Sequence, residues 1–138
     1  MGNKLSTIFI SLVILFVLSC NKTDKHYMSD NKTYKGHLFI EEPRQSFGHV
    51  YRDVVNEVCC SYKLKNTGKK PIVINKIEAS CGCMHTDLTS KVIFPGKEQI
   101  LTIKLNTKSQ YGYINKSVFI NSDSDNPLFI VRIQGDIE

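Results

Sequence analysis

Apolar and polar residues alternate with a period of two in the middle of the chain, and this alternation decides the fold class. Between residues 58 and 65 the even positions, from Val58 to Leu64, are apolar, and most of the odd positions are polar. Successive side chains of a β-strand point to opposite faces, so the segment predicts a strand that covers a core on one side. The domain follows this period rather than the helical period of about 3.6, and we therefore expect few helices.

Other short apolar segments predict the remaining strands. They cover residues 39–40, 47–50, 72–77, 100–105, 117–121 and 128–133. Turn-forming residues such as Gly68, Pro95 and Gly96 separate them, and a polar connection spans residues 122–127. About seven short strands with a turn signal about every ten residues are typical of an all-β sandwich.

The N-terminus has the features of an export signal. Lys4 gives a basic start, residues 8–18 are almost wholly apolar, and Cys20 follows. This apolar run is too short for a membrane-spanning helix, which needs about 20 residues, and behind a basic start it is typical of a removable secretory signal. Residues 17–20 resemble the lipobox of bacterial lipoprotein precursors, whose cysteine is diacylated and becomes the new N-terminus. We therefore expect residues 1–19 to be a lipoprotein signal peptide and Cys20 to carry the lipid.

A polar stretch separates this signal from the predicted strands. Residues 20–37 are expected to form the acylated cysteine and a flexible tether, because they are polar and charged without apolar periodicity. Residues 38–138 suit one domain. The alternatives for the apolar N-terminus are a buried core strand, which the polar stretch disfavours, and an uncleaved membrane anchor. Asn21 is not the Asp that often marks inner-membrane retention in the resembled lipoproteins, so we expect lipid anchoring in the bacterial cell envelope, at the outer membrane.

The charge pattern and the histidines give no indication of nucleic-acid binding or catalysis. The net charge of +5 is modest, and basic residues alternate with acidic ones as on a solvated surface. No glycine-rich phosphate loop follows a predicted strand and opens a helix. None of His26, His37 and His49 comes with a neighbouring nucleophile and acid. We therefore expect no enzymatic activity, no nucleic-acid partner, no small-molecule substrate and no cofactor.

Several short motifs occur in the order found in a known family. They are Phe47-Gly48, Asn66-Thr67-Gly68, Pro71-Ile72, Ser80-Cys81-Gly82-Cys83, Pro95-Gly96, Gly112 and Ile133-Gln134-Gly135. Together they resemble the bacterial domain-of-unknown-function family numbered fifteen seventy-three, over nearly the whole domain. The resemblance implies an immunoglobulin-like β-sandwich, common in secreted or lipid-anchored proteins, and carries no established activity. The chain departs from the family at Met84, where Thr is usual, and at Cys59-Cys60, in a strand that is ordinarily aromatic or aliphatic.

Four cysteines besides Cys20 supply the chemistry of the domain. They are Cys59, Cys60, Cys81 and Cys83. In an oxidising compartment thiols tend to pair, and a bridge from the strand to the Cys81-Gly82-Cys83 segment would stabilise the fold by about 3 kcal/mol. The alternation places Cys60 inward and Cys59 outward. Alternatively, Cys60 is a small core residue, and Cys81 and Cys83 brace a tight loop, reduced or bonded to each other.

Two functional alternatives use the same segment. Cys81, Cys83, Met84 and His85 combine two thiolates, a thioether and an imidazole, a set that suits copper(I) or, without the methionine, zinc. No second cysteine pair lies at a distance that would strengthen the zinc interpretation. A thiol redox role, in which Cys81 and Cys83 exchange with a partner disulfide, needs an exposed thiolate of low pKa.

The sequence thus predicts a lipid-anchored, non-enzymatic sandwich that serves as an interaction or structural module, with the membrane and an envelope protein as partners. Sandwiches of this kind bind through edge strands and through the loops at their ends. The segment 81–86 is the expected functional loop, because it joins polarisable side chains to a constrained backbone. Gly112 is expected at a turn.

Overall fold

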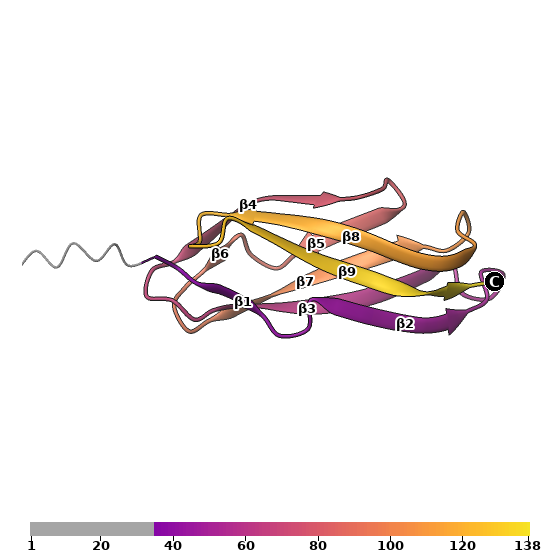
Figure 1. The fold of residues 1–138 in the computed structure, drawn as a ribbon, viewed down its shortest axis with the longest axis horizontal. Helices are drawn as coiled ribbons and strands as arrows, with labels where there is room; N and C mark the ends of the chain where they lie inside the picture. The colour runs from indigo at the N-terminus through magenta and orange to yellow at the C-terminus, as the bar shows by residue number, and fades with distance from the viewer. Residues whose placement is uncertain (1–34) are drawn as a thin grey trace, which may run out of the picture. The chain divides into compact units, whose positions relative to one another are not determined.

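The computed structural model describes residues 35–138, which form two packed β-sheets without a helix in the described part (Figure 1). The four-stranded sheet has the order β1 (Leu38–Ile40), β3 (Glu57–Asn66), β7 (Glu98–Asn106) and β5 (Met84–Leu88). The five-stranded sheet has the order β2 (Arg44–Val50), β9 (Leu128–Ile137), β8 (Gly112–Ser122), β4 (Ile72–Ala79) and β6 (Val92–Ile93). β2 pairs with β9 in parallel, and the other pairs are antiparallel. The predicted β-sandwich is confirmed.

One apolar core lies between the sheets. In β3 the even positions from Val58 to Asn66 are buried and the odd positions are exposed, which confirms the predicted alternation. Apolar residues of the other sheet complete the core. They include Ile72, Ile74, Val118, Ile120, Val131 and Ile133. Each such side chain stabilises the fold by about 1.5–3 kcal/mol relative to an exposed one, so burial of these alternating positions holds the two sheets together.

Nine strands are present in the described residues, against the expected seven or so. All seven predicted segments lie within strands, whereas β5 and β6 were not expected. β5 is a correction, because residues 84–86 were assigned to a functional loop and instead begin a strand at the edge of its sheet. Gly112 is a second correction. It is the first residue of β8 and pairs with Ile137, so it lies just after the turn rather than in it. Its φ is positive, at 77°.

Two buried polar side chains connect elements of the sandwich. Tyr62 of β3 donates its hydroxyl hydrogen to the carbonyl of Arg132 in the opposite sheet, at 2.8 Å, and its burial raises its pKa. Asn66 is fully buried and donates to the carbonyls of Lys70 and Ile93, at 2.7 and 2.8 Å. Both residues therefore satisfy backbone groups that water cannot easily reach.

The described chain is attached to the domain from its first residues. The carbonyl of Gly36 accepts from the backbone N–H of Asp125 at 3.0 Å, and Nδ1 of His37 lies 2.7 Å from a carboxylate oxygen of the same Asp125. The predicted signal peptide, the lipidation site at Cys20 and most of the tether lie outside the described residues. Within residues 35–138, no helix is long and apolar enough to cross a membrane.

Candidate functional site

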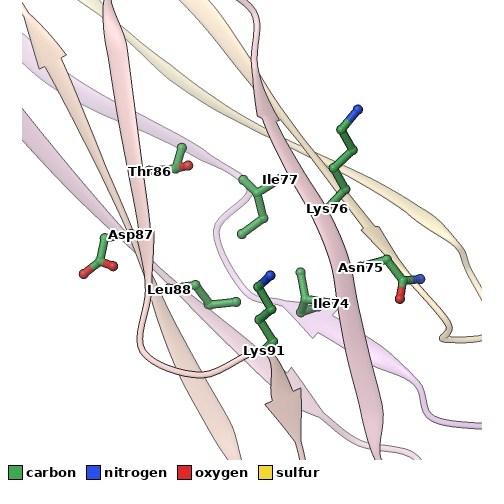
Figure 2. Close-up of a pocket in the computed structure, with 8 residues that line it drawn as sticks. All are labelled: Ile74, Asn75, Lys76, Ile77, Thr86, Asp87, Leu88 and Lys91. Atoms are coloured by element: carbon green, nitrogen blue, oxygen red, sulfur yellow. The ribbon is translucent and has the colours of Figure 1, made fainter.

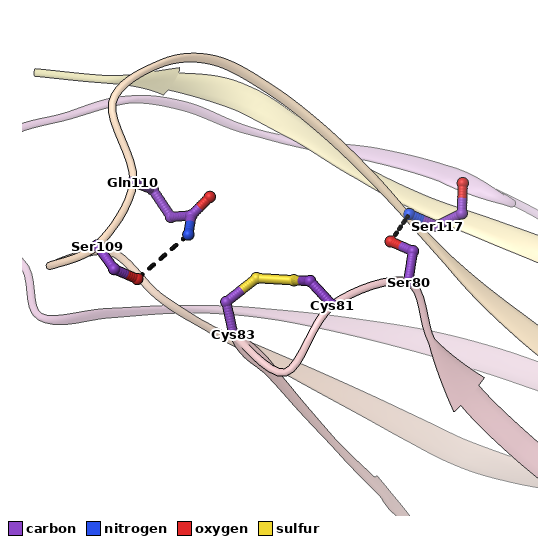
Figure 3. Close-up of a disulfide and its surroundings, with 6 residues drawn as sticks. All are labelled: Ser80, Cys81, Cys83, Ser109, Gln110 and Ser117. Atoms are coloured by element: carbon purple, nitrogen blue, oxygen red, sulfur yellow. Dashed lines mark hydrogen bonds between the residues drawn. A yellow bond between two sulfur atoms is a disulfide. The ribbon is translucent and has the colours of Figure 1, made fainter.

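The predicted cysteine site lies in the connection between β4 and β5, where Cys81 and Cys83 form a disulfide (Figure 3). The connection is held to both sheets by its backbone. Ser80 donates its N–H to the carbonyl of Ser117 in β8 at 2.9 Å, and the carbonyl of Cys83 accepts from Asn106 at the end of β7 at 3.0 Å. The disulfide therefore sits where the chain crosses from one sheet to the other.

The structure confirms the facing of the strand cysteines but not a bridge from them to the loop. Cys59 is exposed, Cys60 is buried, and both are free thiols. β7 lies between β3 and β5, so the strand cysteines are two strand spacings, about 10 Å, from the edge strand. A disulfide joins Cα atoms at most about 7 Å apart, and the 5.2 Å between Cys81 and Cys83 meets that limit. Burial, and secondarily Cys59, raise the pKa of the Cys60 thiol.

The Cys81–Cys83 disulfide contributes little as a brace. It closes a loop of three residues, which the chain-entropy model values at about 1.6 kcal/mol, about half the value of the expected strand-to-loop bridge. The backbone hydrogen bonds of Ser80 and Cys83 already fix the connection without either sulfur. The bond is therefore not needed to determine the path of the chain.

The structure does not assemble the copper or zinc site that the sequence suggested. The two sulfurs of Cys81 and Cys83 are bonded to each other, so neither is a thiolate ligand. Along β5 the side chains alternate, and Met84 is 5% exposed in the core while His85 faces solvent. Among residues 35–138, no group of three or more His, Cys, Asp or Glu is placed to hold a metal ion.

Exposed aromatic and apolar side chains occur in the loops that follow β2 and β7 and at the start of β8. They are Tyr51, Val54, Tyr111 and Tyr113. The turn after β7 connects these loops, because Thr107 donates its N–H to the carbonyl of Asn56 at 3.0 Å while the preceding Asn106 binds Cys83. Arg52 lies over the ring of Tyr111, with its guanidinium carbon 5.6 Å from the ring centroid.

The two long flanks of the sandwich differ in how their strand edges are covered. On one flank the chain passes from β1 in the four-stranded sheet to β2 in the other. There Gln45 donates from Nε2 to the carbonyl of Ser61 at 2.8 Å, which covers the edge of β3 beyond β1. On the opposite flank β5 has a strand neighbour on one side only, and β6 pairs with β4 only at Ile72 and Val73. This second flank is therefore open.

Hydrogen-bond phase shows which backbone groups face the open flank. The carbonyl of Cys83 accepts from the N–H of Asn106, and the N–H of Thr89 donates to the carbonyl of Ile100, so both residues are hydrogen-bonded to β7. Along an antiparallel pair of strands, residues that bond to the neighbouring strand alternate with residues that do not. The N–H and C=O groups of Thr86 therefore point away from β7, as do those of Leu88. The same reasoning applies to β4.

In β4, the Ser80–Ser117 bond sets the phase of pairing with β8. The N–H and C=O groups of Ile77 and Ala79 consequently point away from β8, toward the open flank. Both sheets thus present unpaired backbone groups along the same side of the molecule.

A cleft of about 420 Å³ lies between these two edges (Figure 2). Its lining residues are Ile74, Asn75, Lys76, Ile77, Thr86, Asp87, Leu88 and Lys91. Ile77 and Leu88 are partly buried and form its apolar floor. Figure 2 shows their side chains together with Lys91 in the space between the strands, whereas Lys76 and Asp87 point away to either side. No local sequence pattern indicates that β4 and β5 lie opposite each other, so the sequence does not predict this site.

Comparison with known proteins identifies the family. Residues 38–137 match the family model described as "Protein of unknown function (DUF1573)". The chain belongs to this family. No curated protein sequence matches the DUF1573 chain.

Solved structures place the DUF1573 domain among immunoglobulin-like sandwiches. A protein of unknown function from Porphyromonas gingivalis W83 is 14% identical with a TM-score of 0.66, over 73% of this chain and 46% of that one. The PapD-like domain 7 of human CEP192 is 8% identical with a TM-score of 0.60, over 75% of this chain and 87% of that one. The VesB protease of Vibrio cholerae is 12% identical with a TM-score of 0.57, over 72% of this chain and 31% of that one. The chain spans less than half of the P. gingivalis and V. cholerae proteins, and identities this low show the fold alone.

Packing explains several of the family-like residues in the DUF1573 domain. A side chain at Gly135 would meet the ring of Phe47 and the carbonyl of Gly48 at about 2.5 Å, so these residues pack β2 against β9. The side chain of Asn66 donates hydrogen bonds to the backbone carbonyls of Lys70 and Ile93. Gly82 differs, because a Cβ there would meet no residue other than its two chain neighbours within 4 Å and its φ is not positive. Packing within the domain gives no reason for glycine between the two cysteines.

Proposed function

We propose that this DUF1573 chain is a non-enzymatic interaction module of the bacterial cell envelope that binds an extended segment of another envelope protein along the β4–β5 flank. The observation that carries the proposal is the pair of open strand edges beside the apolar cleft. An extended peptide can add a strand to such an edge through backbone hydrogen bonds, while pockets beside the edge select its side chains. Here the backbone N–H and C=O groups of Thr86 and Leu88 would form the hydrogen bonds to the peptide, and Ile77 helps to form the pocket.

The charges at the cleft favour a particular kind of segment. Lys91 projects into the space between the strands (Figure 2) and has no ion-pair partner within residues 35–138. Lys76, on the far side of β4, is already paired with Glu78 at 2.6 Å. An apolar side chain over Leu88 followed by an acidic residue near Lys91 would therefore match the cleft.

The polar groups of the domain support a binding rather than a catalytic role. The His37–Asp125 pair resembles part of a catalytic triad, but the neighbouring Ser124 hydroxyl bonds to Ser122 and to the carbonyl of Asn126. The imidazole therefore has no hydroxyl to activate among these residues. Instead the pair fixes the entry of the chain into the domain.

A lipid at Cys20 remains part of the proposal. The described part of the chain begins at the end of the sandwich opposite the connection between β4 and β5 (Figure 1). A tether of the predicted length would hold the domain on the order of 20 Å from the membrane. Anchoring through this end would leave the cleft accessible to envelope proteins, and we propose the outer membrane as the location.

A proline at position 86 tests the binding mode. The Thr86 N–H points away from β7, so Thr86→Pro removes a donor of the open edge without breaking a ladder bond. Thr86→Val keeps the N–H and the branched shape, and serves as the matched control. A photoreactive amino acid at Asn75, in the cleft, and another at Lys63, on the covered flank, report contacts in living cells.

We expect cross-linked products at position 75 in the wild-type and Thr86→Val backgrounds, and a decrease of at least about tenfold with Thr86→Pro, as a loss of about 1.4 kcal/mol implies. Products at position 63 should be fewer. Equal yields at position 75 with proline and valine, or equal yields at both positions, would rule out strand addition at this flank.

A further inference from the structure

We infer that the Cys81–Cys83 disulfide is a redox site that exchanges with the dithiol of a protein of the thioredoxin class. This role goes beyond the proposed binding at the β4–β5 cleft and does not depend on it. The site is the connection 80–83 together with the exposed aromatic surface beside it.

The fold tolerates both the oxidised and the reduced state of the Cys81–Cys83 pair. Ser80 and Cys83 hold the connection through backbone hydrogen bonds to β8 and β7, and none of these bonds uses a sulfur atom. Ser80 is held twice, because its hydroxyl oxygen also accepts from the N–H of Ser117 at 3.2 Å (Figure 3). Opening the S–S bond therefore leaves β4 and β5 in place. A disulfide that determined the chain path would not have this property.

A partner thiolate can reach the Cys81–Cys83 disulfide. Cys81 and Cys83 are partly exposed, and Gly82 between them carries no side chain to shield them. Apart from its two neighbours in the chain, no residue has an atom within 4 Å of the space that a Cβ would occupy at Gly82. An attacking thiolate must approach the disulfide along the S–S axis, and a partner backbone can lie over Gly82 while its sulfur does so. This gives the glycine a role that packing within the domain does not.

Exposed side chains in the loops after β2 and β7 and at the start of β8 form a docking surface. Tyr51, Val54, Tyr111 and Tyr113 are exposed there, and Val54 and Tyr111 are 79% and 73% exposed. Tyrosines are enriched at protein interfaces, where they supply contact area at low entropic cost. The turn that carries Tyr111 begins at Asn106, which hydrogen-bonds to Cys83. The turn that leads to Tyr111 therefore adjoins the disulfide, and its exposed ring fits a partner protein rather than a small thiol.

The exchange balances as two successive displacements. A thiolate of the partner attacks one sulfur of the pair, a mixed disulfide forms, and the other sulfur leaves as a thiolate that takes up a proton. The second thiol of the partner then attacks the mixed disulfide and releases the remaining cysteine as a thiol. The partner dithiol loses two electrons and two protons, and the Cys81–Cys83 pair gains them.

Equilibration in glutathione buffers tests the redox property on the full-length chain. Thiols are alkylated at each ratio of reduced to oxidised glutathione, and the mass of each cysteine-containing peptide is measured. We expect Cys81 and Cys83 to become reduced together and reversibly within the range that spans the extracytoplasmic and cytosolic compartments. The exposed Cys59 is the internal control for alkylation. A pair that stays oxidised throughout this range would overturn the inference.

A trapping experiment tests the partner class. The probe is a reduced thioredoxin without its resolving cysteine, whose remaining thiolate attacks a disulfide and stays joined to one of its sulfurs as a mixed disulfide. We expect trapping on the wild-type chain and on Cys59→Ser, and none on the Cys81→Ser/Cys83→Ser double variant. Absence of trapping on the wild-type chain, or trapping that persists on the double variant, would overturn the inference. An unchanged far-UV circular dichroism spectrum and cooperative melting establish that each variant is folded.

The rate of trapping tests whether the partner docks on the aromatic surface. Tyr111→Ser should slow trapping about tenfold, the effect expected when one interface anchor is lost. Phe94→Ser is the matched control, because Phe94 is also an exposed aromatic residue but lies in the turn after β6, close to Asn66 and away from the disulfide. Equal rates for the two variants would refute docking at this surface. Thr86→Pro should leave the rate unchanged, which separates this inference from the proposed cleft.

Discussion

The side chain of Asn66 forms four hydrogen bonds inside the domain, and its removal tests how the sandwich is closed at that end. Nδ2 donates to the carbonyls of Lys70 and Ile93, and Oδ1 accepts from the N–H groups of Gly68, at 2.9 Å, and His37, at 3.3 Å. The amide thus connects the end of β3 to the turn that follows it, to β6 and to the first described residues. Asn66→Ala leaves four backbone groups without this partner.

The magnitude follows from the burial of each bond. The bond to Ile93 is buried, so its carbonyl would remain unsatisfied at a cost of about 1–3 kcal/mol. The other three are partly buried, water can replace the side chain, and each contributes about 0.5–1.5 kcal/mol. We therefore expect Asn66→Ala to lower the free energy of unfolding by about 2.5–7.5 kcal/mol, a large part of the 5–15 kcal/mol typical of a domain.

Urea unfolding followed by far-UV circular dichroism measures this change, and the chain contains no tryptophan that would serve instead. Asn106→Ala is the matched control, because the exposed Asn106 side chain accepts one bond, from the N–H of Lys108 at 3.0 Å. That control should lose less than about 1 kcal/mol. If Asn66→Ala loses no more than the control at an unchanged m-value, the buried amide does not close this end of the sandwich.

Three further changes have defined outcomes. Cys60→Ser should lower the free energy of unfolding by about 1–3 kcal/mol, because it buries a hydroxyl without a partner; an unchanged urea midpoint would contradict this. The hydrogen bond from His37 holds the pKa of the Asp125 carboxyl below its usual 3.8. This hydrogen bond therefore stabilises the fold above pH 3.8, and the stabilisation is lost as the pH falls through the lowered pKa of the folded state. Asp125→Asn should therefore reduce the slope of stability against pH in this acidic range, and an identical slope would exclude the ion pair as its source. Cys20→Ala should move the protein from the membrane to the soluble envelope fraction, whereas continued membrane fractionation would argue against the lipid anchor.

Much of the fold could be predicted because its signals are local. The alternation in β3 assigned Cys60 to the core and Cys59 to the surface, and both assignments hold. β5 was missed because an edge strand needs little apolar alternation. Within Met84–Leu88 one residue is buried, and the strand is held by pairing with β7, which no local pattern encodes.

The candidate cysteine site could also be predicted only where its features are local in sequence. The sequence placed the cysteines of residues 81–83 together, because proximity along the chain ensures proximity in space. It could not exclude a bridge to Cys59 or Cys60, since that depends on β7 lying between β3 and β5. Met84 and His85 are adjacent in sequence but face opposite sides of β5, which separates them as ligands.

The sequence by itself determined that the domain is an all-β sandwich and which side of β3 is buried, because a two-residue period fixes the face of each side chain locally. Only the tertiary structure decided which strands are neighbours. Strand order depends on packing between segments far apart in the chain, and it leaves the edges of β4 and β5 open beside the cleft. The same packing brings the turn after β7, which leads to the exposed Tyr111, against the Cys81–Cys83 connection.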